Sequence, residues 1–156
     1  MNTRKSKKKR QLLVRIKEPF FIHKEAKGTN LTFMIGEYAL PWKAITNVPP
    51  CDAAINEDRL KKLKKAFPEA HIEFNFNREA PAFLFRAIGR TKRCGDDEQN
   101  QSVGDAVARA KATARACVIS KAIIKSVMSG LEEELNRSLG IFEEWHEKER
   151  KIVKGV

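Results

Sequence analysis

Two neighbouring stretches decide the fold, HIEFNFN at residues 71–77 and AFLFRAIGRTK at residues 82–92. Apolar and polar residues alternate strictly along the first, and the second places Phe83, Phe85 and Ala87 on one side and its cations on the other, which is typical of strands with one face buried. The turn-forming residues 78–81 separate them, so the pattern predicts an antiparallel hairpin whose aromatic face packs on the core. The residues that alternation places on the core face are Ile72, Phe74, Phe76, Phe83, Phe85 and Ala87.

Upstream of this hairpin, three further segments read as strands, at residues 12–16, 19–22 and 31–40. They are rich in β-branched and aromatic residues, and turn signals separate them. Prolines make residues 41–54 an irregular connection. A short helix follows, because Asn56 is a suitable N-cap and Pro68 ends the apolar periodicity.

Downstream of the hairpin, the Ala-rich segment 103–129 predicts a long helix, and Gly130 is a stop signal. A final helix is expected from Leu131 onward. The small residues on one broad face of the long helix would let a sheet or another helix approach closely. That face consists of Val103, Ala106, Ala110, Ala114, Cys117, Ile124 and Met128.

These segments together predict an α+β fold. We expect an antiparallel sheet of four or five strands with helices packed on one face, in the order ββ(β)α-ββ-αα. With 156 residues, the chain has the usual size of one domain. Residues 11–156 are expected to form that domain, and residues 1–10 a disordered basic tail.

The net charge of +11 is concentrated at one end of the chain. Residues 1–30 hold ten Lys and Arg against Glu18 and Glu25. A dense basic arm attracts polyphosphate and accelerates association, although it could equally be a solubilising terminus or bind an acidic protein surface. Its cations in the first ten residues are Arg4, Lys5, Lys7, Lys8, Lys9 and Arg10.

A second group of cations lies on the predicted hairpin and long helix, and could follow a phosphate backbone. The strand cations alternate onto the face opposite Phe83 and Phe85, so base stacking on this sheet is not expected. These side chains could also be the ordinary solvated faces of a soluble protein. The group consists of Arg86, Arg90, Lys92, Arg93, Lys111 and Arg115.

No pattern argues for an enzyme. Cys51, Cys94 and Cys117 are far apart, form no CxxC pair, and are expected to be reduced. Phosphate-binding loops, dinucleotide fingerprints and nucleophile elbows are missing from the sequence. The acidic run 96–98 with Asp105 could hold Mg²⁺ in a small nuclease, but it equally fits turn and first-turn chemistry.

Residues 91–97, TKRCGDD, and 104–112, GDAVARAKA, resemble a pattern in small phage and mobile-element proteins of unassigned function. There, a strand ends in a cysteine, an acidic turn follows, and a helix opens with Gly. The resemblance covers about 25 of 156 residues. This sequence lacks the aromatic usual in that turn, and its turn is one residue shorter. The resemblance implies a phage or mobile-element origin, and no activity.

The sequence therefore favours a non-enzymatic nucleic-acid-binding accessory protein, with DNA or RNA as partner, no cofactor and no metal. The alternative is a protein-binding module, an inhibitor or assembly factor, acting through the amphipathic C-terminal helix. No apolar run is long enough for a membrane span, and a cytoplasmic location is expected. The anchors of the alternative are Leu131, Leu135, Phe142 and Trp145.

Overall fold

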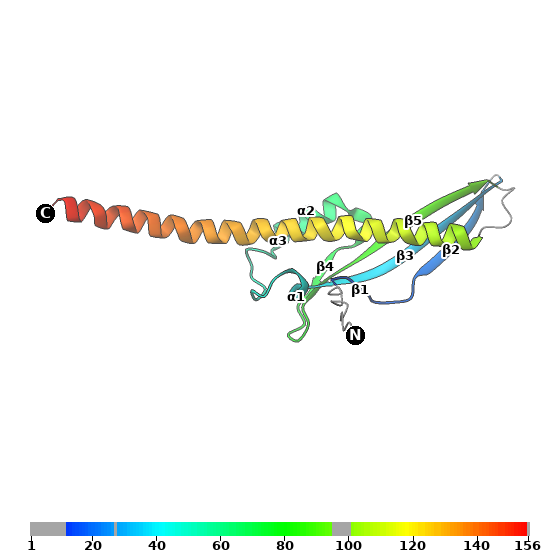
Figure 1. Cartoon of the computed structure of the whole chain (residues 1–156), viewed down its shortest axis with the longest axis horizontal. Helices are drawn as coiled ribbons and strands as arrows, with labels where there is room; N and C mark the ends of the chain where they lie inside the picture. The colour runs from blue at the N-terminus through cyan, green and yellow to red at the C-terminus, as the bar shows by residue number, and fades with distance from the viewer. Residues whose placement is uncertain (1–11, 27, 95–100, 156) are drawn as a thin grey trace, which may run out of the picture.

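The computed structural model describes residues 12–26, 28–94 and 101–155, which form one antiparallel sheet and a very long helix (Figure 1). The elements are β1 (Val14–Arg15), β2 (Phe20–Ala26), β3 (Thr29–Pro41), α1 (Trp42–Ile45), α2 (Glu57–Ala66), the 3₁₀ helix η1 (Pro68–Ala70), β4 (Glu73–Asn75), β5 (Ala82–Cys94) and α3 (Gln101–Lys154). The α+β class is as predicted.

The sheet is built on the long pair β3 and β5, which are antiparallel along thirteen residues each. Its order is β1-β3-β5-β4, and β2 pairs with the same edge of β3 as β1. The predicted β4–β5 hairpin is confirmed, since Phe74 lies opposite Phe83. Phe76 is a correction, because β4 ends at Asn75 and the Phe76 side chain is 70% exposed.

One face of the sheet is covered by the first half of α3 (Figure 1). Strand alternation buries Tyr38 of β3 beside Phe85 of β5, and Met34 opposite Gly89. Gly89 lets the helix approach closely, because a Cβ at that position would lie 1.9 Å from the carbonyl oxygen of Ala108. Small residues on α3 complete this contact. The α3 residues buried on the sheet side are Gly104, Ala108, Ala112, Ala116, Ile119, Ile123 and Val127.

The face of α3 predicted from its small residues is not the one that packs on the sheet. Ala106, Ala110, Ala114 and Cys117 are exposed and point away from the sheet. The segment is apolar on two faces, so its periodicity alone does not distinguish them. The sheet takes the face that carries Ala108 and Ala112, where the helix backbone can come closest to β5.

The predicted break at Gly130 is also wrong, because α3 runs without interruption from Gln101 to Lys154. Gly130 instead accommodates the loop before α2, since a Cβ there would lie 2.3 Å from the carbonyl oxygen of Ala53. Leu131 and the three glutamates after it are good helix formers, so the helix continues beyond the sheet. The half of α3 that protrudes from the body replaces the separate final helix that we expected (Figure 1).

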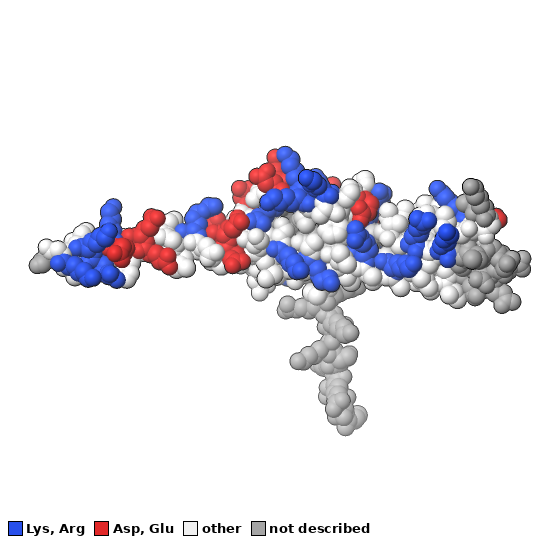
Figure 2. Space-filling model, turned by 90° about the horizontal axis from the view of Figure 1, so that it is seen from above, with Lys and Arg blue, Asp and Glu red and all other residues white. Residues whose placement is uncertain are grey.

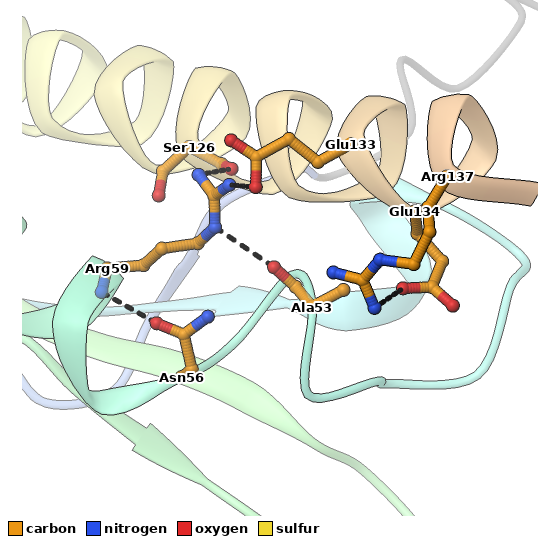
Figure 3. Close-up of polar contacts among 7 residues, drawn as sticks. All are labelled: Ala53, Asn56, Arg59, Ser126, Glu133, Glu134 and Arg137. Atoms are coloured by element: carbon orange, nitrogen blue, oxygen red, sulfur yellow. Dashed lines mark hydrogen bonds and ion pairs between the residues drawn. The ribbon is translucent and has the colours of Figure 1, made fainter. Parts of the chain in front are cut away.

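The connection between β3 and β4 contains more helix than expected, since Trp42–Ile45 form α1 within the predicted irregular segment. The α2 prediction is confirmed, because the Asn56 side chain accepts a hydrogen bond from the Arg59 backbone N–H. Arg59 then fastens α2 to α3 (Figure 3): Nε donates to the carbonyl oxygen of Ala53, Nη1 to that of Ser126, and Nη2 pairs with Glu133 at 2.8 Å.

No helix among the described residues combines the length and the apolar composition needed to cross a membrane.

Candidate nucleic-acid interface

Strand register brings cations and apolar side chains together on the sheet face that α3 does not cover. Phe33 lies opposite Arg90 on β5 and opposite Ile22 on β2, and Leu31 lies opposite Lys92 and Lys24 in the same way. We call this surface the open face. It consists of Phe20, Ile22, Lys24, Leu31, Phe33, Ile35, Glu37, Leu84, Arg86, Ile88, Arg90 and Lys92.

The strand cations lie opposite Phe83 and Phe85, as predicted, but two other aromatic rings lie on the open face, which corrects the expectation that this sheet offers no stacking surface beside its cations. Phe20 is 63% exposed. Phe33 is half-buried, and the Cζ atom of Arg90 lies 5.8 Å from the centroid of the Phe33 ring. Both rings come from β2 and β3, whose register with β5 is set by long-range pairing. The alternation of residues 20–24 and 31–35 is the sequence pattern that could have placed Phe20 and Phe33 on one face of the sheet.

Two of the predicted cations, Arg86 and Arg115, are engaged around η1. The Arg86 guanidinium donates to the carbonyl oxygen of Glu69 at 2.8 Å and contacts His71 Nε2 at 2.9 Å. Arg115 pairs with the Glu69 carboxylate at 2.7 Å and lies over the Phe67 ring. Both therefore hold η1 against the sheet and α3, and they belong to the fold more than to a free basic surface.

This contact also perturbs Glu69. The hydrogen bond from Arg115 lowers the pKa of the Glu69 carboxyl below its ordinary value of 4.5, and a backbone hydrogen bond acts in the same direction. The ionised form of Glu69 is therefore the form that the folded protein favours.

The remaining predicted cations differ in their positions. Arg90 and Lys92 are exposed on the open face, together with Lys24, which sequence reasoning missed. Lys111 reaches from α3 to the edge of β5, where its Nζ donates to the carbonyl oxygen of Arg90 at 3.1 Å. The basic tail 1–10 and the side chain of Arg93 lie outside the described residues.

The anchors of the protein-binding alternative lie mainly on the protruding half of α3. Leu135, Phe142 and Trp145 are 71%, 62% and 59% exposed, and the last two rings stack with centroids 6.2 Å apart. Leu131 differs from them, because it is half-buried and packs against the main core.

Of the acidic candidates, Asp105 alone lies in the described part of the chain. Asp105 Oδ1 lies 2.8 Å from His23 Nε2, which ties the start of α3 to β2. No group of three His, Cys, Asp or Glu side chains is placed to hold a metal ion among residues 12–26, 28–94 and 101–155. Residues 96–98 lie outside this part of the chain.

Comparison of the chain with protein-family models, with curated proteins and with solved structures finds no match in any of the three. The resemblance to phage and mobile-element proteins therefore stays a prediction.

Proposed function

We propose that this chain is a non-enzymatic nucleic-acid-binding accessory protein whose folded contact surface is the open face of the sheet. The observation that carries the proposal is the register that places Arg90, Lys92 and Lys24 around Phe33 and the exposed Phe20. Cations supply phosphate affinity through counterion release, and exposed rings supply stacking surfaces for bases.

This combination favours a single strand over a duplex. The bases of a duplex are stacked on each other, whereas a single strand can lay its bases on a sheet and its phosphates beside lysine and arginine. Stacking on one aromatic side chain contributes roughly 1–3 kcal/mol per base. The open face therefore fits a short single-stranded segment of DNA or RNA, with little dependence on base sequence.

The basic tail adds sequence-independent affinity in this proposal. Six cations in residues 1–10 would give a log–log salt slope of about −5 on duplex DNA, and deleting the tail would flatten that slope. Affinity that is unchanged between low and high salt would contradict the proposal.

The test of the open face uses fluorescence anisotropy with a labelled single-stranded oligonucleotide. The double variant Arg90→Ala with Lys92→Ala is expected to weaken binding and to reduce the salt slope by about 1.4, because two phosphate contacts are lost. Phe20→Ala should weaken binding about 5- to 150-fold without changing the slope, through the loss of stacking of about 1–3 kcal/mol.

The matched control is Lys61→Ala with Lys65→Ala, which removes the same charge from exposed positions of α2. If this control weakens binding as much as the change on β5, net charge decides the affinity and the open face is not the contact surface.

A protein-binding module is the second candidate function. It is favoured by the exposure of Leu135, Phe142 and Trp145 on a helix that extends beyond the body of the protein. Exposed apolar side chains in such numbers mark a surface that another chain covers. Removing residues 138–156 is expected to abolish partner capture and to leave oligonucleotide binding by the open face intact.

A further inference from the structure

The face of α3 that points away from the sheet carries an apolar stripe with heptad spacing. From Val103 to Ile152 its positions are separated alternately by four and three residues, and twelve of the fifteen are apolar. This repeat is the pattern of a coiled-coil contact. We call it the α3 seam. Its apolar members are Val103, Val107, Ala110, Ala114, Cys117, Ile124, Met128, Leu131, Leu135, Phe142, Trp145 and Ile152.

Most of the α3 seam lies open to solvent in the described part of the chain. In the first half of α3, the sheet takes the opposite face, through Ala108, Ala112 and Ile119, and of the seam Ile124 packs half-buried against the main core. In the second half, only Leu131 packs against the body. A helix of 54 residues is roughly 80 Å long, so the seam is far longer than a helix needs for a stable pairing.

Side-chain size along the α3 seam indicates what covers it. The half over the sheet carries small residues such as Ala114 and Cys117, whereas the protruding half carries Phe142 and Trp145. When two copies of α3 run antiparallel, with Met128 of one copy opposite Leu131 of the other, each small residue meets a large one. Ala114 then lies opposite Trp145, and Cys117 opposite Phe142. A parallel pair would instead place alanine against alanine and tryptophan against tryptophan.

Two of the three polar positions fit the same arrangement, since Lys121 of one copy then lies opposite Ser138 of the other, whereas Glu149 lies opposite Ala110. Charge is complementary as well. Residues 101–130 hold five Lys and Arg against Asp105, whereas residues 131–154 hold seven Glu against five Lys and Arg. In Figure 2, acidic and basic side chains alternate along the protruding half of α3, and its tip is basic. Antiparallel pairing sets residues 112–128, which hold Arg115, Lys121 and Lys125 and no acid, against residues 131–147, which hold six Glu and one Arg. The basic tip at residues 148–154 lies opposite Arg109 and Lys111.

We propose that the chain forms a homodimer in which the α3 seams of two copies pair antiparallel. The protruding half of each α3 then lies on the first half of the other, on the side away from the sheet. This arrangement buries the exposed apolar side chains of the α3 seam in both copies and leaves the open faces of both sheets accessible. The inference rests on the protein-binding candidate function, whose partner it names, and it stands independently of nucleic-acid binding.

The mass of the full-length protein in solution, measured by light scattering after size exclusion in reducing buffer, tests the pairing. We expect twice the chain mass of 17.8 kDa at micromolar concentration. Leu135→Asp with Phe142→Asp should halve it. The control Phe76→Asp changes an equally exposed side chain outside the seam and should leave the dimer intact. A monomeric wild-type protein, or a dimer that only Phe76→Asp disrupts, would overturn the pairing.

Cross-linking tests the direction of the pair. Under mild oxidation by diamide, Phe142→Cys should form an interchain disulfide with Cys117, identified by mass spectrometry of the linked peptides. Adding Cys117→Ser should abolish that link. A parallel pair would instead place the two copies of Cys117 against each other, so a wild-type link between them would contradict the antiparallel arrangement.

The same preparations separate the two functions. A monomer that binds the oligonucleotide would overturn the dimer and leave nucleic-acid binding in place, whereas a dimer that ignores the oligonucleotide would do the reverse. A third outcome is a monomeric protein that captures another protein and loses this capture when residues 138–156 are removed. That result would support the protein-binding function and exclude a second copy as the partner.

Discussion

Gly89 determines how closely β5 and α3 approach each other. A Cβ at this position would lie 1.9 Å from the carbonyl oxygen of Ala108 and 2.5 Å from the backbone nitrogen of Ala112, both on α3. Because backbone atoms cannot rotate away, we expect Gly89→Ala to lower the free energy of unfolding by about 3 kcal/mol. Urea denaturation followed by circular dichroism measures the change.

Gly140→Ala is the matched control for that substitution, since nothing lies within 4 Å of a Cβ at that position. Alanine favours a helix interior over glycine by about 1 kcal/mol, so this variant should not lower the urea midpoint. Equal destabilisation by both variants would mean that the close contact between β5 and α3 is not what constrains Gly89.

Glu69 makes stability depend on pH in a defined direction. Its pKa in the folded protein is below the ordinary value of 4.5 because Arg115 donates to its carboxylate. The stabilisation is therefore complete above about pH 4.5 and is lost as the pH falls through the lowered folded pKa. We expect Glu69→Gln to lower the urea midpoint at neutral pH, and the difference from wild type to shrink in acid.

The control for this titration is Glu79→Gln, which changes an exposed carboxylate in the turn before β5. A difference between Glu69→Gln and wild type that grows as the pH falls would contradict the assigned role of Arg115.

At the scale of elements, one side chain joins α2, the preceding loop and α3. Arg59 makes three contacts from one guanidinium, and its side chain is only 16% exposed. A lysine cannot reproduce that fork, so Arg59→Lys should lower the free energy of unfolding by about 1–3 kcal/mol. Urea denaturation measures it, with Arg137→Lys as the control.

Arg137 is a suitable control because its pair with Glu134 is longer, at 3.6 Å, and lies on an exposed helix surface (Figure 3). Such pairs contribute about 0–1 kcal/mol, so Arg137→Lys should change little. A loss equal to that of Arg59→Lys would contradict the role assigned to the fork.

The elements that the sequence predicts well are those with a local signal. Asn56 and Pro68 bound α2, and the alternation in residues 71–77 and 82–92 predicts the β4–β5 hairpin. Gly130 misleads because it serves a tertiary contact and does not end the helix. The loop at Ala53 lies so close to α3 that a side chain at residue 130 would collide with it.

The candidate site was predictable only in part, for the same physical reason. Arg90 and Lys92 follow from alternation within β5, whereas Phe20 and Phe33 reach them through strand pairs that no local pattern specifies. Likewise, α3 is apolar on two faces, and only the contact with Gly89 decides which one meets the sheet. The contacts of Arg59 with α3 could not be predicted from the sequence, where the residue is recognisable only by its position after the N-cap Asn56.

At the scale of the whole molecule, α3 covers one face of the sheet, the other described elements leave the opposite face open, and we propose that nucleic acid binds there. Isoleucine methyl groups report on both faces. Ile22, Ile35 and Ile88 lie half-buried on the open face, whereas Ile119 and Ile123 are buried on the sheet side of α3.

The most direct test is a titration of isoleucine-methyl-labelled protein with a short single-stranded oligonucleotide, followed by NMR. We predict that the methyl signals of Ile22, Ile35 and Ile88 shift in proportion to binding, while those of Ile119 and Ile123 stay in place. Binding that leaves all three open-face signals unmoved would contradict the account.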